Sequence, residues 1–287
     1  MGGLMDGKVC MITGATAGIG RATALGLATM GATVVAVGRD PERGAEAVAD
    51  IKRRSANDAV TFLRADLSSQ QEVRDLAHAF VAAHDRLHVL VNNAGAVFGR
   101  RAVSVDGIEM TFALDHLGYF LLTNLLLPTL ERSAPARVVS VSSRVHRTGH
   151  IAFDNLQGEQ GYRSFRAYGQ AKLANVLFTY ELAQRLRGTG VTATCAAPGL
   201  VASNFGTGNT GLVGIFSRLT HVVAISPAQG AATPIYLASS PLVEGVTGKY
   251  FYKMEDTRSS KESYDATIAR RLWEVSARMT GLVPATA

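Results

Sequence analysis

Tyr168 and Lys172 are the two residues whose types and spacing first suggest chemistry. They open an apolar-patterned run that continues to Leu182 and predicts a helix, and residues four apart on a helix lie on the same face. Because an ammonium group beside a phenol favours the phenolate, we expect Lys172 to lower the pKa of Tyr168 from its usual value of about 10. Such a tyrosine can donate and accept a proton near neutral pH. The same spacing also arises by chance on solvated helix faces, so other motifs of the sequence are needed to show whether this pair is functional.

Short apolar runs that alternate with amphipathic segments must position this pair. Strands are predicted at residues 8–13, 33–37, 60–63, 87–91, 137–142, 191–196 and 249–251. Helices are predicted at 20–30, from residue 41, and near 70–84, 111–130, 168–182 and 263–279. Strands that alternate with helices predict an α/β protein with a parallel sheet covered on both faces. No linker or repeat interrupts the pattern, so one domain over residues 1–287 is predicted.

Composition restricts the classes of function. The 287 residues are 47% hydrophobic and 18% charged, which is typical of a folded protein with a substantial core. The formal net charge is +6, but the basic residues are scattered and not interleaved with aromatic ones, which disfavours nucleic-acid binding. A modest positive field still suits a phosphate-rich small ligand.

Cysteine usage and hydropathy suggest the compartment. Cys10 and Cys195 both lie in strand-like runs and are predicted to be core residues rather than disulfide partners. The first strand begins close to Met1, and the most apolar stretch, residues 117–127, is shorter than a bilayer span. We therefore expect a soluble cytoplasmic protein without a membrane anchor.

A glycine-rich turn joins the first strand to the first helix. Gly14, Gly18 and Gly20 follow the spacing Gly-x-x-x-Gly-x-Gly, with Thr16 and Ile19 between them. Backbone N–H groups and the helix dipole at such a turn bind phosphate, and glycine lets the backbone approach it closely. We therefore predict that these five residues bind a dinucleotide, although a glycine-rich turn without a ligand is the alternative.

The end of the second strand distinguishes two dinucleotides. An acidic residue there binds a ribose 2′-hydroxyl, whereas an arginine accommodates a 2′-phosphate. Arg39 occupies this position and its guanidinium matches phosphate geometry. Asp40 follows and is predicted to cap the helix that starts at Pro41. NADP(H) is thus favoured, and NAD(H) stays possible.

Two further strand ends carry polar residues. Asp66, followed by Leu67, either accepts a hydrogen bond from an adenine amino group or caps the helix near residue 70. Asn93, Ala94 and Gly95 end the fourth strand and either line the nucleotide or form a polar turn. Both sets are expected at the carboxyl edge of the sheet, where ligands of open α/β sheets bind.

The last two strand ends complete the candidate site. A hydroxyl at Ser143 can donate to a developing oxyanion near Tyr168, unless it serves only a serine-rich turn. Pro198 and Gly199 end the sixth strand, and Val201 begins an apolar, glycine-punctuated segment. We predict that this segment, at about residues 200–225, is a lid over a hydrophobic substrate, the alternative being an insertion with no such role. No metal site is predicted.

Together these motifs resemble the short-chain dehydrogenase/reductase family. The motifs are Thr13-Gly-x-x-x-Gly-Ile-Gly20, Asn92-Asn-Ala-Gly95, Ser143, Tyr168-x-x-x-Lys172 and Pro198-Gly199. Residues 116–123, 154–158, 171–175 and 269–273 are similar to the retinol dehydrogenase-like branch, here in a soluble, bacterial form. The resemblance covers essentially the whole chain. It implies a single Rossmann-type, doubly wound parallel sheet of about seven strands, a nicotinamide cofactor, reversible carbonyl–alcohol chemistry and a homodimer or homotetramer.

The resemblance also implies roles for single residues. In that family the serine orients the carbonyl, the tyrosine transfers the proton and the lysine binds the nicotinamide ribose, which maps onto Ser143, Tyr168 and Lys172. Pro198 and Gly199 resemble the part that positions the nicotinamide. The family usually has an asparagine in the fourth helix that holds a water against the lysine, and this chain has Asp115 there.

Asp115 raises an alternative function. An ionised carboxylate attracts Lys172 and weakens the influence of that lysine on Tyr168. A dinucleotide-binding scaffold or sensor with impaired catalysis is therefore the alternative to an oxidoreductase.

Overall fold

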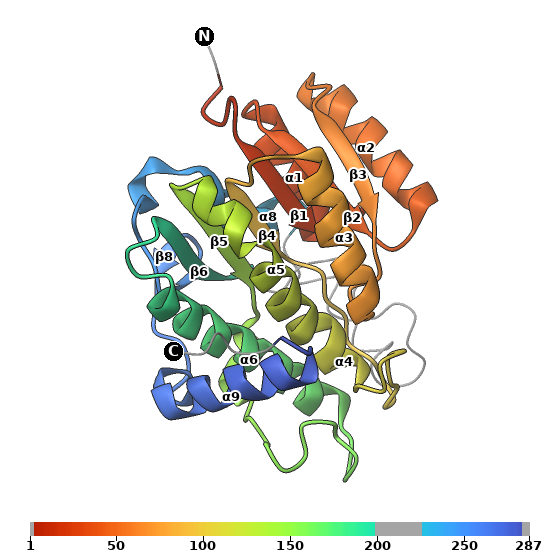
Figure 1. Ribbon diagram of the computed structural model, residues 1–287, viewed down its shortest axis with the longest axis vertical. Coiled ribbons are helices and arrows are strands. Elements are labelled where there is room, and N and C mark those ends of the chain that lie inside the picture. The colour runs from red at the N-terminus through yellow and green to blue at the C-terminus, as the bar shows by residue number, and fades with distance from the viewer. Residues whose placement is uncertain (1–2, 199–225, 283–287) are drawn as a thin grey trace.

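The computed structural model describes residues 3–198 and 226–282. Its strands form one eight-stranded sheet with helices packed against it (Figure 1). The strand order is β3-β2-β1-β4-β5-β6-β7-β8. The strands are β1 (Val9–Thr13), β2 (Thr33–Gly38), β3 (Val60–Arg64), β4 (Val89–Asn92), β5 (Ala136–Val141), β6 (Val191–Ala197), β7 (Lys249–Tyr252) and β8 (Glu255–Asp256). The first seven are parallel and the two-residue β8 pairs antiparallel with β7. The predicted doubly wound sheet is confirmed, with one short strand added.

Helices cover both faces of this sheet. On one face lie α1 (Gly18–Thr29), α2 (Pro41–Ser55) and α8 (Pro227–Ser239), and on the other lie α3 (Gln70–Ala83), α5 (Gly118–Arg132) and α6 (Ser164–Arg185). The C-terminal helix α9 (Ala266–Met279) packs on α6. Because alternate residues of a strand point to opposite faces, Met11 joins the core of α3, α5 and α6, whereas Cys10 and Ile12 join that of α1 and α8.

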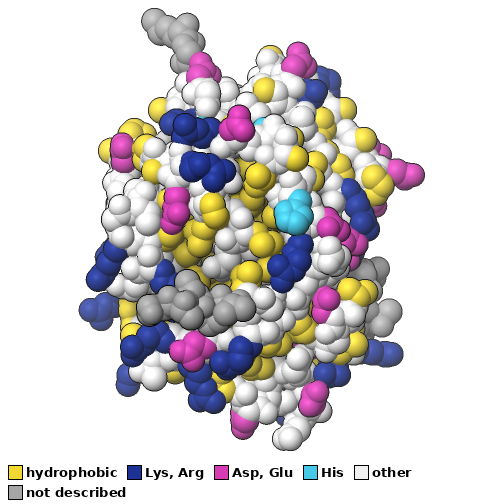
Figure 2. Space-filling view, viewed as in Figure 1, with side chains coloured by type: hydrophobic (Ala, Val, Ile, Leu, Met, Phe, Trp, Pro, Cys, Tyr) yellow, Lys and Arg dark blue, Asp and Glu magenta, His cyan; other side chains and the backbone are white. Residues whose placement is uncertain are grey.

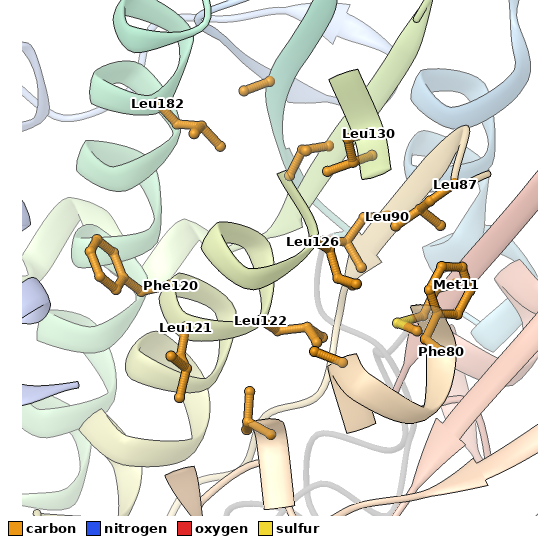
Figure 3. Packing of buried hydrophobic residues seen from close by; sticks show 14 of the residues in the cluster. Met11, Phe80, Leu87, Leu90, Phe120, Leu121, Leu122, Leu126, Leu130 and Leu182 are labelled. Atoms are coloured by element: carbon orange, nitrogen blue, oxygen red, sulfur yellow. The ribbon is translucent and has the colours of Figure 1, made fainter. Parts of the chain in front are cut away.

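The core beneath α5 is built from leucines on one stripe of that helix. Leu122, Leu126 and Leu130 point toward Leu90 of β4, and Phe80 of α3 packs beside Met11 (Figure 3).

On the surface, lysine and arginine side chains are spread among acidic ones rather than gathered in one patch (Figure 2). The scattered basic residues of the sequence thus stay scattered on this face.

The fourth helical segment is not one regular helix. Its first turn is α4 (Met110–Phe112), followed by a π-helical turn (Ala113–Leu117) and then α5. Within the described residues, Met110–Arg132 is the one helix long and apolar enough to cross a membrane, but its most apolar 18-residue window, of mean hydropathy 1.3, is 72% buried in the protein. The stretch is longer than the sequence indicated, and its burial is that of a core helix. Single π turns inside α-helices often accompany functional sites.

The two C-terminal helices also differ from the predictions. Helix α8 was not predicted, although Ser226 and Gln229 form a capping box that marks its start, with Pro227 at the first helical position. The C-terminal helix begins at Ala266 rather than near residue 263, because a 3₁₀ turn (Glu262–Tyr264) precedes it and Asp265 caps it. Further 3₁₀ turns lie at Arg144–Thr148 and Pro241–Val243.

Candidate active site

The glycine turn between β1 and α1 has the geometry of a phosphate site. Gly14 and Gly18 have positive φ angles of 66° and 54°, which glycine adopts without strain. A Cβ on Gly20 would lie 2.3 Å from the carbonyl oxygen of Gly14. Thr16 lies against Gly38 at the end of β2, where a Cβ would be 2.6 Å from its methyl group, and Ile19 is half-buried.

The start of α1, like that of α6, lacks the side-chain cap that several other helices have. Its first turn has no side-chain cap and no acidic residue. By contrast α2, α3, α8 and α9 each begin with a side chain that accepts from backbone N–H groups; these are Asp40, Ser69, Ser226 and Asp265. The N–H groups at the start of α1 are therefore available to a ligand, and an anion such as a pyrophosphate fits both them and the helix dipole.

Thr13 braces the ends of β1 and β4. Its hydroxyl oxygen accepts from the backbone N–H groups of Asn93 at 2.8 Å and of Ala94 at 3.0 Å. The Asn93 side chain donates to the Thr13 carbonyl at 2.8 Å. A Cβ on Gly14 would lie 2.9 Å from the Cα of Ala94. The predicted residues Asn93 and Ala94 thus lie beside the glycine turn, with their polar groups engaged in holding the two strand ends together.

Arg39 is exposed at the end of β2, on the same edge of the sheet. Asp40 uses one carboxylate oxygen to accept from the N–H groups of Glu42 at 3.0 Å and Arg43 at 3.1 Å, so its predicted capping role is confirmed. The neighbouring Arg64 donates to the Arg39 carbonyl at 3.3 Å and forms an ion pair with Glu72. The Asp40 carboxylate thus serves the start of α2, and the cation Arg39 lies exposed beside it.

Asp66 forms a local turn after β3. One carboxylate oxygen accepts from the backbone N–H of Ser68 at 3.0 Å and from its hydroxyl at 2.7 Å. The cap of α3 is Ser69, so the alternative that Asp66 caps that helix is wrong. Leu67 is buried in the core beside α5, and its carbonyl lies close to Gly118.

The residues predicted to do chemistry converge on α6. Tyr168 and Lys172 lie on one face, with the Lys172 Nζ atom 5.4 Å from the centre of the Tyr168 ring. The side chain of Ser143 lies close enough to the Tyr168 hydroxyl to oppose the rise in its pKa. Ser143 also accepts from the N–H of Val145 at 3.3 Å, and its carbonyl accepts from the His146 ring at 2.6 Å. The structure therefore brings the serine, tyrosine and lysine together at the carboxyl end of the sheet.

Asp115 lies in the π turn and faces Lys172 directly. Its Oδ2 is 3.0 Å from Lys172 Nζ, and both side chains are buried. Its Oδ1 accepts from the N–H of Ala96 at 2.8 Å. A Cβ on Gly95 would lie 2.9 Å from the Asp115 carboxylate and 3.0 Å from the Lys172 ammonium. Gly95 is thus required because the ion pair passes so close to the backbone.

This ion pair reverses the predicted electrostatics of Tyr168. Burial raises the pKa of Tyr168 well above its ordinary value, and the Asp115 carboxylate raises it further, while the Ser143 side chain opposes both. Burial likewise raises the pKa of Asp115, and Lys172 opposes that change. The expectation of a lowered phenol pKa is wrong here, because burial raises the pKa of Tyr168 most and the Asp115 carboxylate adds to that rise.

Several residues of the site were not predicted from the sequence. Tyr119 places its ring 5.6 Å from Lys172 Nζ, and Asn175 donates to the Asp115 carbonyl at 2.8 Å. Helical spacing was the available signal, since Tyr119 follows Asp115 by four residues and Asn175 follows Lys172 by three. Tyr162 donates to the Phe98 carbonyl at 3.0 Å and ties the segment before α6 to the loop after β4; no short-range pattern announces this contact.

The final set of predicted residues is only partly described. Pro198 follows β6 and is half-buried. Gly199, Val201 and the predicted lid at 200–225 lie outside the described residues.

Comparisons with known proteins agree with this geometry. The family profile described as short chain dehydrogenase matches residues 8–210. Human retinol dehydrogenase 14 is 41% identical over 297 residues, covering 98% of this chain and 88% of that protein. A crystal structure of an uncharacterised protein of Mycobacterium paratuberculosis aligns with a TM-score of 0.77 at 33% identity, covering 96% of this chain and 94% of the other. The RhlG/NADP active-site complex of Pseudomonas aeruginosa aligns with a TM-score of 0.69 at 29% identity, covering 88% and 96%.

Proposed function

The chain belongs to the short chain dehydrogenase family, and on that premise we propose that it is an NADP(H)-dependent oxidoreductase that interconverts a carbonyl and an alcohol on a hydrophobic small molecule. The observation that carries the proposal is the convergence of Ser143, Tyr168 and Lys172 beside an uncapped, glycine-lined helix start. A proton-transferring phenol thus lies at the same sheet edge as a phosphate site. This is the layout that a nicotinamide-dependent reaction on an alcohol needs.

Each residue has a chemical task in this proposal. A bound nicotinamide supplies a hydride to the carbonyl carbon, or takes one from the alcohol carbon in the reverse direction. Tyr168 gives its phenolic proton to the carbonyl oxygen as negative charge develops there, so hydride and proton together form the alcohol. Ser143 donates to the same oxygen and orients it. Lys172 binds the ribose side of the cofactor, and its charge is shared with Asp115.

Arg39 supports the preference for NADP(H). It is the cation at the end of β2, and the carboxylate next to it in the chain, Asp40, already caps α2. The RhlG structure contains NADP, which is consistent with the same dinucleotide here. Gly14, Thr16, Gly18, Ile19 and Gly20 are proposed to hold the pyrophosphate.

The substrate class and the biological setting are proposals of the same kind. The apolar composition of residues 200–225 and the name of retinol dehydrogenase 14 both support a hydrophobic carbonyl or alcohol. We propose a cytoplasmic location and a homodimer or homotetramer.

A scaffold or sensor is the second candidate, and the Asp115–Lys172 ion pair favours it. The two functions are separated by NADPH oxidation with a panel of apolar ketones and aldehydes. The oxidoreductase predicts turnover that falls roughly 10²- to 10⁴-fold in Tyr168→Phe. Tyr180→Phe is the matched control, because it removes the same atom from the same helix, where the hydroxyl contacts Ser259 at 2.7 Å. NADPH binding without turnover, unchanged by Tyr168→Phe, would establish the scaffold instead.

A further inference from the structure

Behind the candidate active site, buried groups from three elements form one chain of hydrogen bonds. The Asp115 carbonyl accepts from Asn175 Nδ2 at 2.8 Å, and Asn175 Oδ1 lies 3.3 Å from His116 Nδ1. The other ring nitrogen of His116 lies 2.9 Å from the Ser276 hydroxyl. All four residues have 0% of their surface exposed. These hydrogen bonds lead from Asp115 of the π turn to Asn175 of α6, return to the π turn at His116, and end at Ser276 of the C-terminal helix.

The direction of every bond in this chain follows from its first acceptor. A carbonyl can only accept, so Asn175 donates with its Nδ2 and turns its Oδ1 toward His116. His116 must therefore carry its proton on Nδ1, which leaves Nε2 to accept from the Ser276 hydroxyl. Burial lowers the pKa of His116 to about 4, which keeps the ring neutral at physiological pH. Each donor in the chain thus meets one acceptor.

This chain joins the two backbone segments that carry the ion pair. His116 directly follows Asp115 in the π turn, and Asn175 lies one helical turn after Lys172 on α6. The separation of those segments sets the distance between the carboxylate and the ammonium. Gly95 leaves no free space beside the pair, so a small displacement of the π turn alters its geometry.

The C-terminal helix is firmly seated at the other end of the chain. Trp273 stacks on Phe178 with ring centres 5.7 Å apart and meets Phe120 edge-on at 4.9 Å. Ser276 follows Trp273 by one turn, so its hydroxyl approaches His116 from a fixed element. The aromatic contacts give α9 its position, and the hydroxyl transmits that position to His116.

We propose that Ser276 is a positioning residue of the active site, which acts through His116 and Asn175 to hold Asp115 at ion-pair distance from Lys172. Removing the hydroxyl leaves a buried acceptor on His116 without its donor. The π turn is then free to shift, and the contact of Asp115 with Lys172 weakens. Because Lys172 opposes the effect of burial on the pKa of Asp115, a weaker contact raises that pKa. The groups whose charge or polarity acts at Asp115 are Lys172 and Tyr168 of α6, Tyr119 of α5, Glu109 before α4, and Tyr162.

The test is a ¹³C NMR titration of the aspartate side-chain carboxyls in the full-length protein. The Asp115 signal is assigned by its loss in Asp115→Asn. We expect Ser276→Ala to raise the midpoint of the Asp115 titration, and Ser276→Cys, which keeps the shape and a weak donor, to raise it less. The matched control is Leu272→Ala on the same helix, which creates a cavity in the adjoining core and leaves the hydrogen bonds intact. A midpoint that is equal in Ser276→Ala, Ser276→Cys and Leu272→Ala overturns the proposal.

The effect on turnover rests on the proposed function, and the titration does not. With an apolar ketone and NADPH, kcat is measured as a function of pH in Ser276→Ala and in Leu272→Ala. The pH profile of kcat should move in Ser276→Ala and stay in place in Leu272→Ala. If the unmodified protein shows no turnover, the proposed function has failed, while the Asp115 midpoint still decides the role of Ser276.

Discussion

In the glycine turn between β1 and α1 the functional atoms belong to the backbone, whereas around Tyr168 and Lys172 they belong to buried side chains from distant parts of the chain. The turn is contained in residues 14–20, and we propose that it acts through backbone N–H groups and the absence of Cβ atoms. The proton-handling region gathers Ser143 from the end of β5, Asp115 from the π turn, and two residues of α6. Local sequence therefore specifies the first region, while long-range contacts set the electrostatics of the second.

The largest effect is expected from filling the space in the glycine turn. In Gly20→Ala the new Cβ would meet backbone atoms of Gly14 at 2.3 Å and 2.8 Å, and backbone cannot rotate away as a side chain can. We expect NADPH affinity to fall roughly 100-fold, about the loss of two charge-assisted hydrogen bonds. Isothermal titration calorimetry measures the Kd for NADPH in the variant and in the unmodified protein.

Gly26→Ala is the control on the same helix. There the three nearest atoms to the Cβ all belong to the Ile235 side chain, with its terminal methyl group nearest at 2.5 Å. A side chain can rotate away, so NADPH affinity should stay at the wild-type value. Equal affinities in Gly20→Ala and the unmodified protein would mean that the turn does not hold the cofactor, and the contrast between the two regions would fail.

Arg39→Ala is expected to change the choice of dinucleotide rather than the chemistry. Loss of a charge-assisted contact with the 2′-phosphate should lower kcat/KM for NADPH by about 10- to 100-fold and leave that for NADH almost unchanged. Arg64→Ala should change neither by more than about 2-fold, because its guanidinium already serves Glu72 and the Arg39 carbonyl. The ratio of kcat/KM for the two cofactors gives the answer, and an unaltered ratio in Arg39→Ala refutes the assignment.

Asp115→Asn should produce the smallest change, and it should be confined to the proton-handling region. Ionised Asp115 raises the pKa of Tyr168, so removing that charge lowers it. A larger fraction of phenolate at a given pH accelerates alcohol oxidation, by roughly 3- to 10-fold near neutrality, since one pKa unit is a tenfold change in population. The basic limb of the profile for carbonyl reduction should move to lower pH for the same reason.

The activities of Asp115→Asn and the unmodified protein at low pH provide an internal check on this prediction. Burial raises the pKa of Asp115, so below that pKa the carboxyl is protonated and neutral, as the amide is. The variant and the unmodified protein should therefore converge at acid pH and separate as pH rises. The Kd for NADPH should be equal in both. Profiles that superimpose at every pH would show that Asp115 does not tune Tyr168.

Much of the fold could be predicted because its signals are local. The strand–turn–helix pattern, the cap at Asp40 and the position of Arg39 each depend on neighbours in the sequence. Helix α8 is not among the predicted helices, although its capping box is visible in the sequence at Ser226 and Gln229.

The electrostatics of Tyr168 could not be predicted from spacing. The four-residue interval to Lys172 places the two groups on one face but does not show which charge lies nearest the ammonium. That depends on a π turn, on a glycine at residue 95 and on hydrogen bonds between residues up to 160 positions apart, as between His116 and Ser276. Asp115 itself was identified as a departure from the family, but the reversal of the Tyr168 pKa followed only from its burial and distance.

Transfer of deuterium from the cofactor tests the central claim most directly. NADPH deuterated at C4, in each of its two stereochemical forms, is incubated with the protein and an apolar ketone, and the product is analysed by mass spectrometry. We predict an alcohol with one deuterium on the carbinol carbon from one of the two forms, and a loss of that product in Tyr168→Phe but not in Tyr180→Phe. Tight NADPH binding with no deuterated alcohol from either form would contradict the account.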